Sequence, residues 1–194
     1  MPHTRKSAQH QNPTFRGRHR FEHWYRDNQV YFITARCRGR SPAFATETAK
    51  AVFWDRFDHY TARYGFTPWV TSLLDNHYHT LGYLRRGDDL PGMMQRLHGS
   101  VAKLVNDTLP QRLTPFWKDK DHDNYMDGCL RDEKQGRATY RYVCGQAQRH
   151  EITHDWRLYP HTRINVAEDR AIRRALELNV FLTGVPYKRY ERPR

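Results

Sequence analysis

Two strand-like segments separated by a two-residue turn place the strongest constraint on how this chain can fold. Residues 66–74 and 77–84 are rich in aromatic, β-branched and other apolar side chains, and Asp75 and Asn76 lie between them. Because aspartate and asparagine favour tight turns, this pattern predicts that the two segments pair as an antiparallel hairpin. A hairpin is not stable alone, so we expect it to lie in a larger central sheet.

The second strand of this hairpin carries two histidines at alternate positions. Successive side chains of a strand point to opposite faces, so His77 and His79 are expected on one face of the sheet and Tyr78 on the other. Two imidazole ligands on a rigid strand form the start of a divalent metal site. On its own, a His-x-His pair is more often a pair of ordinary core or surface histidines.

The rest of the chain predicts an α+β protein. Apolar residues at helical spacing predict a helix over residues 46–64, which ends before Gly65, and another over residues 90–109. The remaining expected elements are a first strand at 29–37, a strand pair formed by 116–118 and 125–130, a helix over 132–148, an irregular segment at 155–164 and a terminal helix over 167–182.

The length of 194 residues fits one domain with extensions. We expect a basic flexible arm at residues 1–26, a catalytic domain at 27–153, and a C-terminal extension at 154–194 that holds a helix and a basic tail.

The charge of the chain indicates a polyanionic partner. Lysine and arginine number 33 against 21 acidic residues, which gives a net charge of +12. Nucleic acid is the partner that this balance favours, although basic charge can also serve solubility alone. The candidate phosphate contacts are Arg36, Arg38, Arg40, Lys118 and Lys120. For each of them, a solvated strand end or a polar turn is an equally good interpretation.

No apolar run approaches the roughly 20 residues that cross a bilayer, and the N-terminus lacks the apolar stretch of a signal peptide. We therefore expect a cytoplasmic protein with no membrane partner.

The helix expected at 132–148 contains a tyrosine and an amide one turn apart. Tyr142 and Gln146 are four residues apart and share a helix face. If that face lies over the histidine strand, the amide oxygen of Gln146 can act as a third ligand for Mg or Mn. Tyr140 is the alternative tyrosine, but its partner one turn on is Cys144, a poor ligand for a hard cation.

These motifs resemble those of a known superfamily. Asn76-His77-Tyr78-His79 is similar to the His-hydrophobic-His motif of the HUH endonucleases, and residues 142–146 resemble the tyrosine helix of its single-tyrosine transposases. The order and separation of the motifs most resemble the REP-associated tyrosine transposases and the related insertion-sequence transposases.

The resemblance implies a ferredoxin-like or RRM-like sandwich with a central antiparallel sheet, helices on one face and a C-terminal helical extension. It implies that Tyr142 attacks single-stranded DNA beside a hairpin and forms a 5′-phosphotyrosine link, and that His77, His79 and Gln146 hold Mg or Mn. Some relatives act as homodimers and others as monomers, so both states stay open.

Two other functions compete with the transposase interpretation. The first is a domesticated protein that binds hairpin or repeat DNA but no longer transposes it. The second is a metal hydrolase that uses an activated water, but the histidine motif has no adjacent carboxylate to serve as a base, and Tyr142 would have no role.

Overall fold

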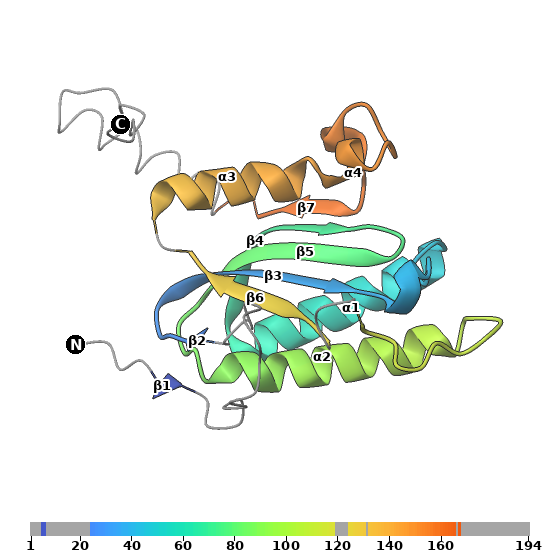
Figure 1. Ribbon diagram of the computed structural model, residues 1–194, viewed down its shortest axis with the longest axis horizontal. Coiled ribbons are helices and arrows are strands. Elements are labelled where there is room, and N and C mark those ends of the chain that lie inside the picture. The colour runs from blue at the N-terminus through green and yellow to red at the C-terminus, as the bar shows by residue number, and fades with distance from the viewer. Residues whose placement is uncertain (1–4, 7–23, 119–123, 131, 166, 168–194) are drawn as a thin grey trace, which may run out of the picture.

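The computed structural model describes residues 5–6, 24–118, 124–130, 132–165 and 167. Its centre is a five-stranded antiparallel sheet in the order β6-β3-β5-β4-β7 (Figure 1). The strands are β3 (Gln29–Arg36), β4 (Phe66–Leu73), β5 (His77–Leu84), β6 (Met126–Cys129) and β7 (Thr162–Ile164). Two short strands, β1 (Arg5–Lys6) and β2 (Trp24–Tyr25), pair with each other outside this sheet.

The predicted hairpin is confirmed as β4 and β5. These strands pair antiparallel, with Ser72 opposite His79 and Leu73 opposite Tyr78. Strand β5 also pairs along its whole length with β3, where Thr34 lies opposite His79 and Arg36 lies opposite His77. Directly opposed residues of an antiparallel pair point to the same face, so Thr34, Arg36 and both histidines share one face of the sheet.

Two long helices cover the other face, as predicted. They are α1 (Glu47–Tyr64) and α2 (Asp89–Asn106). Thr46 caps the start of α1 by accepting a hydrogen bond from the Ala49 amide, and Gly65 ends the helix at φ 68°, a left-handed conformation that glycine adopts without strain. The main core lies between these helices and the sheet, and its largest fully buried side chains include Tyr31, Ile33, Phe44, Phe53 and Tyr78.

The third long helix departs from the expected arrangement on one face. Helix α3 (Glu133–Cys144) lies on the side of the sheet opposite α1 and α2 (Figure 1). Its Val143 and Cys144 form a second, smaller cluster with Val70 of β4 and Leu81 of β5. The α+β class and the central antiparallel sheet are confirmed, but this sheet is covered by helices on both faces.

Three local predictions are wrong. Residues 125–130 do not pair with 116–118: β6 pairs with β3, and Trp117 forms a single bridge to Cys37. The helix expected over 132–148 is interrupted at Gly145, a poor helix former, and resumes as the short helix α4 (Gln146–Arg149).

The third error concerns the segment 155–164, which was expected to be irregular. After a 3-10 turn, η3 (Trp156–Leu158), the chain adds strand β7 to the edge of the sheet beside β4. A second 3-10 turn, η2 (Arg38–Arg40), follows β3. Most of the predicted arm at 1–26 and nearly all of the predicted terminal helix at 167–182 lie outside the described residues.

A buried histidine in the main core predicts acid sensitivity. His98 of α2 donates from Nδ1 to Oδ1 of Asn124 at 2.5 Å, accepts at Nε2 from the Tyr78 hydroxyl at 2.8 Å, and stacks on Trp117. Burial lowers the pKa of His98 to about 4, although the hydrogen bond to Asn124 opposes this shift. The folded state therefore holds this imidazole neutral at pH values where an exposed histidine takes up a proton.

We expect the contribution of His98 to the free energy of unfolding to fall by about 2 kcal/mol between pH 7.5 and pH 5. The unfolded chain binds a proton at His98 as the pH falls below about 6.5, whereas the folded chain binds it only near pH 4. The stabilisation from the neutral His98 is thus fully present above the pKa of the histidine in the unfolded chain, and it decreases as the pH falls below that value. Urea unfolding of the wild type and of His98→Gln at both pH values measures it, and the variant should show the shallower pH dependence. Equal pH dependence in the two proteins would contradict the assignment.

Candidate active site

The candidate site lies on the face of the sheet opposite α1 and α2, between the histidine strand and helices α3 and α4. His77 and His79 of β5 are both buried, at 2% and 5% exposure, and their ring centroids are 5.0 Å apart. Tyr78, between them, points into the main core as predicted. The period-two alternation of the strand therefore separates the candidate ligands from the core tyrosine.

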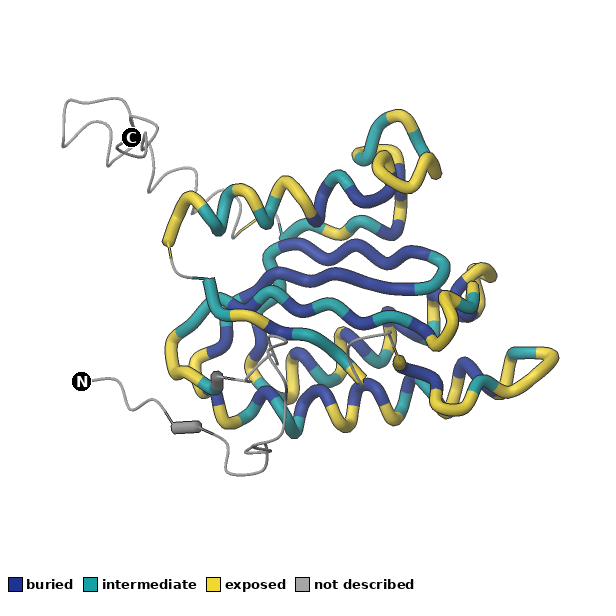
Figure 2. Tube along the Cα trace, viewed as in Figure 1, coloured by how far each residue is buried: buried dark blue, intermediate teal, exposed yellow. Residues whose placement is uncertain are grey.

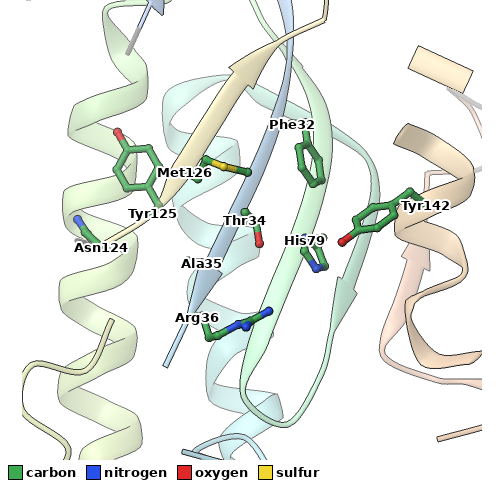
Figure 3. Close-up of a pocket in the computed structure, with 9 residues that line it drawn as sticks. All are labelled: Phe32, Thr34, Ala35, Arg36, His79, Asn124, Tyr125, Met126 and Tyr142. Atoms are coloured by element: carbon green, nitrogen blue, oxygen red, sulfur yellow. The ribbon is translucent and has the colours of Figure 1, made fainter. Parts of the chain in front are cut away.

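Tyr142 comes to this site from α3. Its ring centroid is 5.3 Å from that of His79, and its hydroxyl is directed toward His79 (Figure 3). The side chain is 37% exposed, so a substrate can reach it. Tyr140, the alternative tyrosine, packs instead beside the apolar cluster of Val70, Leu81, Val143 and Cys144. The structure therefore separates the two tyrosines by position.

The residues that follow Tyr142 continue along the histidine strand. His150, which follows α4, has its ring centroid 4.9 Å from that of His77. Gln146 is midway in sequence between Tyr142 and His150, is 1% exposed, and its backbone carbonyl accepts a hydrogen bond from the His150 amide. Gln146 thus lies on the chain segment between two residues that contact the histidine pair, Tyr142 at His79 and His150 at His77.

The orientation of the Gln146 amide is fixed by its own helix. Its Nε2 donates a hydrogen bond to the Tyr142 carbonyl at 2.9 Å. Its Oε1 is buried and, within the described part of the chain, has no hydrogen-bond partner, and the same holds for Nδ1 of His79. Buried polar atoms without partners are costly, and they are expected where an ion belongs.

His77 is oriented by the residue before it. Its Nδ1 donates to Oδ1 of Asn76 at 2.5 Å, which leaves the lone pair on Nε2, the form in which histidine binds metal. Asp75, the other residue of the turn, pairs instead with Lys50 at 3.2 Å. The Asn76 contact was missed because a turn residue next to a histidine is usually read only as a turn residue.

Positive charge surrounds the histidines. The pKa of His79 is held well below its usual value, mainly by burial and then by His77, Arg36, His150 and Arg149. The pKa of His150 is also lowered, by burial and by Arg36, Arg149 and Arg40. These shifts favour neutral imidazoles, which a metal ligand must be, and they show that cationic side chains converge here.

The donor set fits a hard divalent cation. The described residues contain no group of three histidine, cysteine or acidic side chains that could hold a metal. A site at His77 and His79 would take the Gln146 amide oxygen as its third protein ligand, and two imidazoles with one neutral oxygen suit Mg or Mn with open positions for substrate oxygens.

Of the five predicted DNA contacts, some lie near this site and others do not. Arg36 points from β3 toward His79 (Figure 3), and Arg40 lies near enough to influence His150. The Arg38 side chain donates a hydrogen bond to the Thr114 carbonyl. Lys118 is exposed, and its backbone amide donates a hydrogen bond to the Arg36 carbonyl. Lys120 lies outside the described residues.

Arg149 was missed in the sequence. Its guanidinium carbon lies 5.0 Å from the centroid of the Tyr142 ring, a cation–π contact. Tyr142 and Arg149 are seven residues apart, which is two turns of a continuous helix and could have indicated this contact. The helix is interrupted at Gly145, however, so helical spacing does not predict which side chains meet across the break.

The fold of this chain, an antiparallel sheet with two strand histidines facing a helix that carries a tyrosine, is shared with a solved transposase structure. It is similar to the solved structure of a REP-associated tyrosine transposase bound to a REP hairpin, with a TM-score of 0.61 and 16% sequence identity. The match covers 75% of this chain and 82% of the other.

A second solved structure, a candidate transposase from Deinococcus radiodurans R1, gives a TM-score of 0.43 at 14% identity. It covers 68% of this chain and 97% of its own, and a likeness this weak supports no argument. No protein-family model and no curated protein sequence matches this chain. No helix within the described residues has the length and apolar character needed to cross a membrane.

Proposed function

We propose that this protein is a metal-dependent transposase or endonuclease that cleaves and rejoins single-stranded DNA next to hairpins, with Tyr142 as the nucleophile. The observation that carries this proposal is the contact of Tyr142 with His79 on the face of the sheet opposite α1 and α2. Nδ1 of His79 and the amide oxygen of Gln146, one helical turn after Tyr142, are both buried without a hydrogen-bond partner among the described residues. The fold shared with a transposase bound to a hairpin supports the same class of substrate.

The proposed reaction is a transesterification. The Tyr142 hydroxyl oxygen forms a bond to the scissile phosphorus while the bond from phosphorus to the 3′ oxygen breaks, and the phenol proton leaves the tyrosine as the departing 3′ oxygen gains one. The products are a 5′-phosphotyrosine and a free 3′-hydroxyl. Attack of a 3′-hydroxyl on the phosphotyrosine reverses the bond exchange and rejoins the DNA, so no other energy source is needed.

His77, His79 and Gln146 would hold the Mg or Mn ion, which withdraws charge from the scissile phosphate and thereby helps a weak nucleophile. The Gln146 side chain also ties this ligand to the nucleophile's helix, because its amide nitrogen bonds to the Tyr142 carbonyl. The cationic residues Arg36 and Arg149 favour binding of the phosphate chain near Tyr142.

The test is incubation of the full chain with a library of single-stranded DNA hairpins and Mn, followed by a denaturing gel. We expect a protein–DNA adduct that requires the metal, and a released fragment whose 3′-hydroxyl a polymerase can extend. If the protein binds hairpins but leaves every one intact, the proposal is wrong, and the protein is a hairpin-binding protein without cleavage activity.

The contact between Arg149 and the Tyr142 ring predicts a measurable role for Arg149. A cation–π contact at an exposed site is worth about 0.5–1 kcal/mol, so Arg149→Ala should slow adduct formation at least roughly two- to fivefold. Arg149→Lys should restore part of the rate. Arg157→Ala is the matched control, because Arg157 makes the same contact with Trp156, at 4.9 Å, outside the site. Single-turnover kinetics decides, and equal effects of the two alanine variants would remove Arg149 from the site.

A further inference from the structure

A pocket of about 200 Å³ opens beside Tyr142 and His79 (Figure 3). Its walls include Phe32, Thr34 and Arg36 of β3 and Met126 of β6. None of the ligand or nucleophile roles described above accounts for Phe32, Thr34 or Met126. The pocket is therefore a feature of the open face that the cleavage chemistry alone does not require.

The sequence of β3 explains why this space is open. Residues alternate along the strand, so that Tyr31, Ile33 and Ala35 are buried in the core under α1 and α2, while Phe32 and Thr34 are half-buried on the opposite face. Helix α3 packs over β4 and β5 on that face and leaves the part above β3 and β6 uncovered (Figures 1 and 2). The half-buried band on β3 follows from this incomplete cover.

The lining combines flat apolar surfaces with polar groups. The Phe32 and His79 rings are nearly parallel, 9° apart, with centroids separated by 5.7 Å, and the Met126 side chain extends toward them from β6 (Figure 3). Thr34 and Arg36 supply a hydroxyl and a guanidinium on the same strand face. A planar, partly polar ring attached to an anionic group is the chemistry that fits such a lining, since aromatic side chains stack on bases and arginine contacts phosphates.

We infer that this pocket binds the base of the unpaired nucleotide adjoining the phosphate that Tyr142 attacks. The inference rests on the proposed function, because the attacked phosphate is defined by Tyr142. A nucleotide next to that phosphate lies within reach of the pocket, because the Tyr142 ring is part of its lining. Stacking between Phe32 and Met126 holds the base, and Arg36 contacts the sugar–phosphate chain. The pocket then selects which single-stranded position is cut.

The experiment uses the full chain carrying Tyr142→Phe, which keeps bound DNA intact, and hairpins with single-stranded flanks that contain one 5-iodouracil at each position in turn. Irradiation cross-links the modified base to the residue on which it stacks, and peptide mass spectrometry locates the link. We expect one flank position to link to Phe32 or Met126. Links found only outside the pocket overturn the inference.

A filled pocket gives the second measurement. Met126→Trp should lower the cross-link yield at that position and the affinity for a hairpin with a short flank by about tenfold, the size of one lost base stack. Leu104→Trp is the control, because Leu104 is partly exposed on α2, on the far side of the sheet. Thermal unfolding checks that both variants are folded. If Met126→Trp folds and binds as the wild type does, the pocket inference is wrong.

The two proposals fail separately. If the wild type forms the tyrosine adduct but the cross-links map elsewhere, the pocket inference fails and the cleavage proposal stands. If the cross-links map to the pocket but no hairpin yields an adduct, the protein binds the nucleotide without cutting the chain. A protein that binds no hairpin at all contradicts both.

Discussion

Tyr142→Phe is expected to form no covalent adduct with hairpin DNA, a loss of at least about 10³-fold in cleavage, while Tyr140→Phe stays close to the wild type. The phenylalanine keeps the ring that contacts His79 and Phe32 but removes the oxygen that would attack phosphorus. DNA binding should therefore persist when cleavage is lost.

Tyr140→Phe is the matched control because it makes the same chemical change two residues away, on a ring that packs beside the apolar cluster rather than at the histidines. A denaturing gel detects the adduct, and a filter-binding assay measures affinity for the same hairpin. An adduct that survives in Tyr142→Phe and disappears in Tyr140→Phe would reverse the assignment of the two tyrosines. An adduct that survives in both would place the nucleophile elsewhere.

Gln146→Leu is expected to abolish stabilisation of the protein by Mn, whereas Gln146→Glu should preserve it. Leucine fills nearly the same volume but provides no oxygen, so the two histidines would be left without their third ligand. Binding to the folded state at 100 times the dissociation constant adds about 2.7 kcal/mol to stability, which a thermal melt resolves as several degrees. The Leu variant should show almost none of this shift.

The readout needs no DNA and no activity, so it tests the metal site independently of cleavage. Gln148→Leu is the control: Gln148 is exposed on the same short helix and bonds to the His154 carbonyl, away from the histidine pair. Without metal, Gln146→Leu loses one bond to the Tyr142 carbonyl but also removes a buried oxygen that lacks a partner, so its own stability should change little. Equal Mn shifts in the wild type and Gln146→Leu would exclude Gln146 as a ligand.

Local sequence patterns predicted the parts of the fold that depend on neighbours in the chain. The hairpin around Asp75 and Asn76 and the face shared by His77 and His79 follow from turn preference and a period of two, and both are present. Helix α1 ends at Gly65 for an equally local reason. Such features need no knowledge of distant segments.

The missed parts depend on contacts between segments far apart in the sequence. Strand β6 pairs with β3, almost 100 residues earlier, and β7 pairs with β4; both strands are too short for a periodic signal. The contact between Arg149 and Tyr142 depends on how α4 continues after the break at Gly145. The pocket arises because α3 covers only part of the sheet. The position of α3 depends on tertiary packing and cannot be predicted from the sequences of the strands.

The two edge strands have a consequence for how the site is assembled. Strand β6 forms one edge of the sheet and leads into α3, and β7 forms the other edge and follows α4. The tyrosine helix is thus tethered at both ends to the sheet that carries the histidines of the same polypeptide. One chain brings together the nucleophile and all three candidate ligands, so a single copy of the protein would be able to carry out the proposed catalysis. Its rate would rise in simple proportion to protein concentration, and mixing a chain that lacks the tyrosine with one that lacks a histidine would not restore a working site.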